Sequence, residues 1–360
     1  MPEIWLPYGK DEVVINVKAE NINHIVESSE KQIDEEELLS RLENVEYSDL
    51  VIHDGSRQSR QLIELLQKKW ESSSKKPRLV EARSLIFDSA QEASEAEHLL
   101  VDGSMLKVPS FLLKGRPLVI SSFSFNPIFG FFGPHLLLAA ASGLVGEAMK
   151  RWDRKLSPGG DPDAGWFLMR FARSIPESKT VTFVRNSKGI TEVRYGDIEA
   201  TIAYMKDYLK TRGSAELQQS RLVVLGAGGD VNDSTFASSL LSVANNLNAI
   251  ADDAEIIIVA ECIEGLGSSY IRRIVDGAQL SRDASAWEEV ILNELAKRGR
   301  IHLVSTLPKS IVERRLKMKP YSALRDAFES VQQAHGWRFK ANIIADSSNF
   351  ITLQPTQIKE

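Results

Sequence analysis

The chain has 360 residues, of which 43% are hydrophobic and 26% are charged, and its formal net charge is −5. This length is enough for two domains with separate cores, and the apolar fraction is that of ordinary globular proteins. The acidic excess argues against a dedicated nucleic-acid-binding protein, which needs a surplus of Lys and Arg to neutralise phosphates.

Cysteine content and the N-terminus bear on the cellular compartment. Cys262 is the only cysteine, so neither an internal disulfide nor a cage of thiolate ligands can form. The first residues lack a basic segment followed by an apolar one, as a secretory signal would have. The longest uncharged stretch, residues 117–146, is broken by Pro and Gly and does not predict a membrane helix. We therefore expect a cytoplasmic protein with no membrane partner.

Strands and helices alternate along the first half of the chain. Residues 34–45 carry leucines at helical spacing behind an acidic first turn and predict a helix, and a second leucine stripe follows Arg57. Short apolar runs predict strands at residues 11–18, 49–53, 78–82, 116–122 and 179–186. Such alternation is typical of crossover units in a mostly parallel sheet.

The second half repeats this alternation more regularly. A polar helix at residues 197–211 leads to apolar strands at 221–226, 255–261, 301–305 and 342–348. Asp233 or Ser234 is the expected cap of a helix that runs to about Ile250. The expected fold class is therefore α/β, with two domains that are each a mostly parallel sheet flanked by helices, and a cleft between them. The expected boundaries are 1–195 for the first domain, 196–218 for a linker helix region and 219–360 for the second domain.

Three segments follow predicted strands, where ligands gather in parallel sheets. In the first, Asp54, Ser56 and Arg57 lie at the start of a predicted helix. These residues could bind an anion, or Asp54 or Ser56 could simply cap the helix. In the second, Gly228 and Gly229 would let a ligand approach the backbone, although a tight turn explains them equally well.

The third segment contains Glu261, which follows a strongly apolar strand. It suits either an acid–base group or a carboxylate that holds backbone amides. His135 begins a helix rich in small residues and is a second candidate for catalysis, with a buried structural histidine as the alternative. His53 and His302 lie in apolar strands and are expected to be core or strand-edge residues. Because no two histidines show metal-ligand spacing, no metal site is predicted.

In this order, these segments resemble the nickel-dependent lactate racemase family over nearly the whole chain. The similar pieces are LPYGKDEVVINV at the start, DLVIHDGSR, FSFNPIFGFFGPHLLLAAASG, VVLGAGGDVND, IIIVAECIEGLGS and HLVSTLP. The resemblance implies a cofactor, the nickel-pincer nucleotide, that is bonded to a lysine while histidines bind the nickel and move protons.

The matched positions depart from that chemistry. Asn126 or its neighbour occupies the position of a proton-transfer histidine of the family. Leu136 lies at or beside the position of the tethering lysine, and Asn232 occupies the position of another lysine. No histidine follows His135 within sixty residues, where the family has a nickel ligand. We therefore predict no cofactor, because the lysine and histidine anchors of the nickel-pincer nucleotide are absent.

The function expected from the sequence is binding of a small carboxylate or phosphorylated ligand in the cleft, without nickel-dependent lactate racemisation. The ligand-binding candidates are Asp54, Ser56, Arg57, Asn126, Gly228 and Gly229, and the catalytic candidates are Glu261 and His135. Whether the chain is an enzyme stays open; if it is, a racemase- or epimerase-type isomerase is expected. The alternatives are a non-enzymatic metabolite- or nucleotide-binding sensor, or a scaffold subunit that pairs through the helix after His135. A homodimer is compatible with the sequence, and nucleic acid is not an expected partner.

Overall fold

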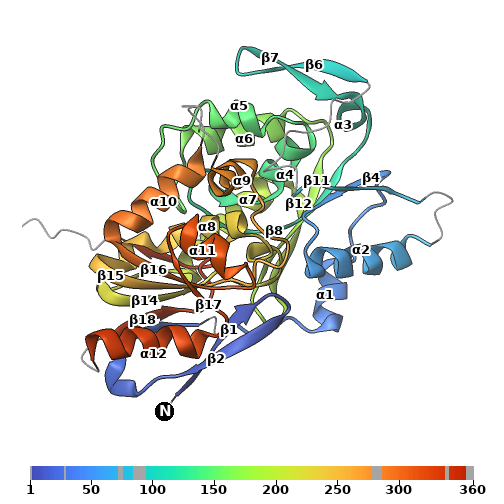
Figure 1. Cartoon of the computed structure of the whole chain (residues 1–360). Coiled ribbons are helices and arrows are strands. Elements are labelled where there is room, and N and C mark those ends of the chain that lie inside the picture. The colour runs from blue at the N-terminus through green and yellow to red at the C-terminus, as the bar shows by residue number, and fades with distance from the viewer. Residues whose placement is uncertain are drawn as a thin grey trace, which may run out of the picture. The chain divides into compact units, whose positions relative to one another are not determined.

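A computed structural model describes residues 2–27, 30–71, 76–83, 95–277, 286–336 and 340–353 (Figure 1). The chain divides into two compact units. Unit 1 comprises Met1–Ser29, Phe125–Pro127 and Arg212–Glu360, and unit 2 comprises Glu30–Ser124 and Ile128–Thr211.

Unit 1 is built on a six-stranded sheet in the order β17-β16-β15-β14-β18-β3, in which every neighbouring pair is parallel. Its strands are β3 (Ile22–Val26), β14 (Ser220–Gly226), β15 (Ile250–Val259), β16 (Gly299–Val304), β17 (Lys319–Tyr321) and β18 (Ala341–Ile344). Two short pairs accompany it: β1 (Glu3–Tyr8) with β2 (Asp11–Asn16), and β13 (Ser214–Glu216) with β19 (Ile351–Leu353). Its helices are α8 (Phe236–Val243), α9 (Ser269–Asp276), α10 (Trp287–Arg298), α11 (Lys309–Arg314) and α12 (Leu324–His335), with short 3-10 turns at Ala19–Asn21, Asp230–Asn232 and Ala244–Ala249.

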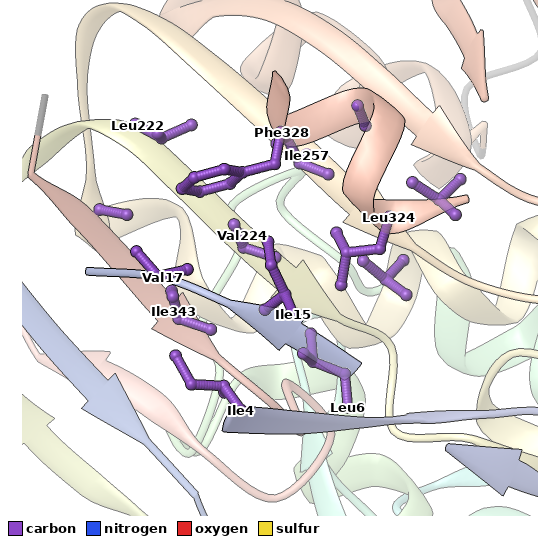
Figure 2. Close-up of a cluster of buried hydrophobic side chains, with 14 of the residues drawn as sticks. Ile4, Leu6, Ile15, Val17, Leu222, Val224, Ile257, Leu324, Phe328 and Ile343 are labelled. Atoms are coloured by element: carbon purple, nitrogen blue, oxygen red, sulfur yellow. The ribbon is translucent and has the colours of Figure 1, made fainter. Parts of the chain in front are cut away.

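Hydrophobic alternation in these strands builds a core on each face of the sheet. Figure 2 shows one of them, where Leu324 and Phe328 of α12 meet Val224 and Ile257 of the sheet, together with apolar side chains of β1 and β2. The alternate residues face the other way, toward α10, which contacts β15 and β16. Strands buried on both faces explain the nearly continuous apolar runs of the sequence.

Unit 2 contains a five-stranded sheet in the order β12-β11-β8-β4-β5, parallel except for the β11–β12 pair. Its strands are β4 (Leu50–His53), β5 (Arg78–Glu81), β8 (Leu118–Ser122), β11 (Lys179–Arg185) and β12 (Ile190–Asp197), beside a separate hairpin of β6 (Ala96–Val101) and β7 (Ser104–Pro109). Two further short strands are β10 (Gly130–Phe132) and β9 (Ser124–Asn126), of which Phe125 and Asn126 cluster with unit 1. The helices are α1 (Glu35–Arg41), α2 (Arg57–Lys69), α3 (Ser110–Lys114), α4 (Pro134–Ala141), α5 (Val145–Met149), α6 (Asp163–Arg173) and α7 (Ile198–Arg212).

The α/β class and the mostly parallel sheets are confirmed, but the units divide the chain at other places than expected. The first 29 residues were assigned to an N-terminal domain of residues 1–195, yet they cluster with the C-terminal half. The reason is that β3 pairs with β18 and thereby extends the six-stranded sheet of unit 1. The expected linker, residues 196–218, contains the whole of α7, and all of this helix except Arg212 belongs to unit 2.

No helix in the described ranges combines the length and apolar character needed to cross a membrane.

Candidate functional site

Asp54 lies at the carboxyl end of β4 and is completely buried. Its Oδ1 accepts hydrogen bonds from the amide (3.0 Å) and hydroxyl (2.6 Å) of Ser56, and its Oδ2 accepts from the amide (2.7 Å) and hydroxyl (2.6 Å) of Ser122. Burial alone would raise the pKa of Asp54, but the hydrogen bonds from Ser122 and Ser56, with the charge of Arg83, outweigh burial and lower it. Asp54 is therefore an ionised carboxylate that ties β4, β8 and α2 together.

Ser56 is the N-cap of α2, because its Oγ accepts a hydrogen bond from the amide of Ser59 at 3.2 Å. The cap alternative of the sequence analysis is thus what the structure shows for Ser56. Arg57 is the first residue of the helix and is exposed. Among these three residues, Asp54 and Ser56 are buried and Arg57 is exposed.

His53 precedes this turn and is buried, as expected for a strand histidine. Its Nδ1 accepts a hydrogen bond from the amide of Gly55 at 3.1 Å, and burial lowers the pKa of its imidazole. Gly55 has φ +76°, and a Cβ there would lie 2.5 Å from Oε1 of Glu81. The turn therefore needs glycine for both backbone and steric reasons.

His135 and Leu136 lie inside α4, whose residues are all buried. Burial and then the charge of Lys206 lower the pKa of His135 to about 3, so its imidazole is neutral. Its Nδ1 is buried and meets no hydrogen-bond partner among the described residues. Leu136 is fully buried and has no nucleophilic atom. Because α4 is buried, the helix offers no exposed face for the scaffold alternative.

The glycine turn after β14 lies in unit 1 and is closely packed. Gly228 has φ +102°, and a Cβ there would lie 2.3 Å from Oδ1 of Asp346 and 2.8 Å from Oγ of Ser348. Gly229 has φ +66°, and its Cβ would lie 2.9 Å from Cβ of Pro7. The protein's own side chains thus account for both glycines as a tight turn.

The side chain of Glu261 packs against Gly9, in the N-terminal segment. A Cβ on Gly9 would clash with the Glu261 carboxylate. Both segments meet at Asp233, whose Oδ2 accepts from the amides of Gly9 (2.8 Å) and Glu261 (3.2 Å). Burial, and next the nearby Cys262, Glu261 and Asp233, raise the pKa of Tyr8 to about 12. Tyr8 is therefore a protonated phenol that can donate a hydrogen bond.

Asp233 has a role that the sequence did not predict, since the pattern around it indicated at most a helix cap. Thr235 caps α8 instead, and that helix ends at Val243 before a 3-10 turn. Asp233 is wholly buried and its partners are more than twenty residues away in the chain, so no local pattern reveals it.

The predicted site residues fall into two groups, one in each unit. Unit 2 holds Asp54, Ser56, Arg57 and His135, whereas unit 1 holds Asn126, Gly228, Gly229 and Glu261. Asn126 is buried, and Asn232 donates a hydrogen bond from its Nδ2 to Ser348 Oγ at 2.9 Å.

A pocket of about 510 Å³ in unit 2 lies at the opposite, amino ends of β4, β8 and β11. Its cations already pair with carboxylates: Arg116 with Glu177 and Lys179 with Asp197, each at 2.6 Å, and Arg173 with Glu199. None of the predicted site residues lines it.

No protein-family model and no curated protein matches this chain. Among solved structures, the lactate racemase apoprotein from Thermoanaerobacterium thermosaccharolyticum matches with a TM-score of 0.73 and 17% identity, over 98% of this chain and all of that one. The fold is lactate racemase-like. A crystal structure of a Thermotoga maritima protein matches more distantly, with a TM-score of 0.56 and 11% identity over 89% of this chain and 97% of that one.

Proposed function

We propose that this lactate racemase-like chain binds a small carboxylate or phosphorylated ligand through Arg57 and the first amides of α2. The exposure of Arg57 at the start of a 13-residue helix is the observation that supports this. A helix start attracts anions, and a guanidinium can donate two parallel hydrogen bonds to a carboxylate or phosphate. Asp54 and Ser56 contribute by holding this helix end in place.

The nickel-pincer nucleotide of the resembling family does not fit the residues of this chain. The position at or beside the tethering lysine is Leu136, a buried side chain that forms no covalent bond to a cofactor. Within the described part of the chain, no three His, Cys, Asp or Glu residues are grouped so that they could hold a metal ion. We therefore propose that the chain does not perform nickel-dependent lactate racemisation, and we derive no catalytic step through that group.

A catalytic role for His135 or Glu261 is part of this proposal only if the chain is an isomerase-type enzyme. The buried, neutral imidazole of His135 is poorly suited to hold a proton near neutral pH. Ligand binding is thus the better supported function.

A thermal-shift screen tests this binding site, with inorganic phosphate and small hydroxy acids as the probes. A ligand at about a hundredfold excess over its Kd stabilises the folded state by roughly 2.7 kcal/mol. We expect Arg57→Ala to weaken binding by about tenfold or more, since a hydrogen bond to a charged group contributes roughly 1.5–3 kcal/mol.

Arg60→Ala is the matched control, because Arg60 lies one turn further along α2 and pairs with Glu81 at 3.3 Å. It should retain the ligand-induced shift. Equal shifts in the wild type and Arg57→Ala would remove Arg57 from the site and contradict the proposal.

A further inference from the structure

A group of five cations lies on α11 and on the segment that leads from α11 into β17 of unit 1 (Figure 1). Over residues 309–319 the only acidic residue is Glu313. The cations, which we call the α11 cation patch, are all exposed: Lys309, Arg314, Arg315, Lys317 and Lys319.

Apolar side chains of the same segment anchor it in unit 1 and leave its cations outside. Leu307, Val312 and Met318 are buried. The amide of Met318 donates a hydrogen bond to the carbonyl of Val312 at 3.0 Å, and α11 contacts β17. From Arg315 to Lys319 every cation alternates with a residue that is at least partly buried. The patch is therefore part of the packed surface of the unit.

The charges of this patch are not compensated by neighbouring carboxylates, in contrast to those of two other helices of unit 1. Helices α10 and α12 pair every Lys and Arg that they carry: Lys297 and Arg298 with Glu294, and Arg325 with Glu329. None of the five patch cations forms an ion pair within the described part of the chain. The patch thus presents a concentrated positive field to solvent.

Lys317 takes a backbone conformation that favours glycine. Its φ is +60°, in the left-handed region, just after the end of α11. A residue with a Cβ adopts this region at a cost in free energy, and many helices place Gly there. Strain of this kind persists where a side chain is needed for function. The lysine therefore adds a charge to the patch at a position where glycine would fit the backbone better.

We propose that the α11 cation patch docks an acidic segment of a partner protein. The carboxylates of such a segment would supply the counter-charges that the chain itself does not place there, and complementary charge of this kind steers and orients association. Six helical residues followed by five extended ones span roughly 25 Å at most. About eight residues of extended peptide cover that length.

The charge of the whole chain favours a short acidic segment over a larger polyanion. The formal net charge is −5, so the surface beyond the patch repels a nucleic acid or an anionic bilayer that extends past it. A segment of about eight residues ends where the patch ends and avoids this repulsion.

Fluorescence anisotropy of a dye-labelled octaglutamate peptide, titrated with the full chain in 50 mM NaCl, tests the docking surface. Reversal of three patch charges in one variant, Lys309→Glu with Arg314→Glu and Lys317→Glu, should weaken binding by about tenfold or more, because three exposed ion pairs are replaced by repulsions. Raising the NaCl concentration to 200 mM should also weaken binding of the wild type, since screening shortens the range of exposed charges.

A triple variant of unit 2 is the matched control for net charge. Lys68, Lys107 and Lys188 are exposed, and changing all three to Glu alters the net charge by the same amount. This control should bind the peptide within about twofold of the wild type. Thermal unfolding checks that both triple variants are folded. An undetectable interaction of the wild type at millimolar concentrations, or equal losses in the two triple variants, would overturn the proposal. So would tighter binding of octauridylate or of phosphatidylserine vesicles than of the peptide.

Lys317→Gly separates docking from stability at a single position. The variant should unfold at the same or a higher temperature than the wild type, because glycine relieves the left-handed backbone. Its affinity for octaglutamate should nevertheless fall by about two- to threefold, as expected for one exposed ion pair. Wild-type affinity in Lys317→Gly would contradict the proposal, because the strained lysine would then contribute nothing to docking.

Discussion

Asp54 and Arg57 are three residues apart in the chain, yet the structure gives them opposite surroundings. Asp54 is wholly buried with four hydrogen bonds, whereas Arg57 is exposed. A carboxylate with this many internal donors has a structural role, because its removal leaves buried donors without an acceptor. In the proposed site, the ligand-binding groups are therefore the Arg57 guanidinium and the helix start.

Asp54→Ala should lower the free energy of unfolding by about 3 kcal/mol, since it leaves the buried amide and hydroxyl of Ser122 without an acceptor. Urea denaturation followed by circular dichroism measures the change. Glu64→Ala, an exposed position on α2, should stay within about 0.5 kcal/mol of the wild type. Equal stability of Asp54→Ala and Glu64→Ala would show that the carboxylate does not hold the turn.

Gly228 and Gly103 separate a backbone requirement from a steric one. Both have positive φ, but a Cβ on Gly103 would meet nothing within 4 Å, whereas one on Gly228 would strike Asp346 and Ser348. Gly103→Ala should therefore cost about 1 kcal/mol, and Gly228→Ala at least about 2 kcal/mol. Thermal unfolding of both variants tests the order, and a smaller loss for Gly228→Ala would be inconsistent with the close packing.

At the scale of elements, ionic attachments at Glu255, in the middle of β15, hold β16 and α12 to this strand. Burial alone would raise the pKa of Glu255, but hydrogen bonds from Arg300, His302 and His335 lower it to about 2. Because the folded-state pKa is depressed, the stabilisation is complete above the unfolded pKa near 4.5 and is lost as the pH falls toward 2. Acid should therefore weaken the attachment of β16 and α12 to Glu255.

Glu255→Gln should remove that part of the pH dependence. The free energy of unfolding of the wild type should fall more steeply than that of the variant between pH 4.5 and pH 2, by up to about 3 kcal/mol. Urea titrations at several pH values measure the two slopes. Parallel slopes would mean that Glu255 is not protonated over this interval.

At the scale of the whole molecule, the fold of lactate racemase is present while the chemistry of its family is unsupported. The described chain superimposes on the racemase apoprotein over nearly its full length, at 17% identity. A shared fold does not fix a reaction, because the reaction depends on the groups in the site. Leu136 and the neutral His135 supply neither a tether nor a ready proton donor.

Purified protein supplied with nickel and the pincer nucleotide should leave D- and L-lactate unconverted, because a racemase needs a proton acceptor and donor at the reacting carbon. Chiral chromatography measures the conversion, with a racemase of the resembling family as the positive control. Turnover above background would refute the proposed loss of this reaction.

Local patterns were sufficient for most secondary structure. The apolar runs at β4, β8, β11, β14, β15 and β16 predicted buried parallel strands, and the leucine stripes predicted α1 and α2. The separate β6–β7 hairpin and the pairing of β3 with β18 were not predicted. Both are strands whose partners or exposure depend on the rest of the fold, and β3 meets β18 more than three hundred residues away.

The sequence by itself determined the fold class and the placement of candidate residues at strand ends, because periodicity and residue identity are local properties. Only the tertiary structure decided that Asp54 and Ser56 hold the helix start, that Gly228 and Gly229 make room for Asp346 and Pro7, and that Asp233 joins distant backbone segments. The physical reason is that burial and hydrogen-bond partners arise when remote segments pack together, and no stretch of sequence contains both partners.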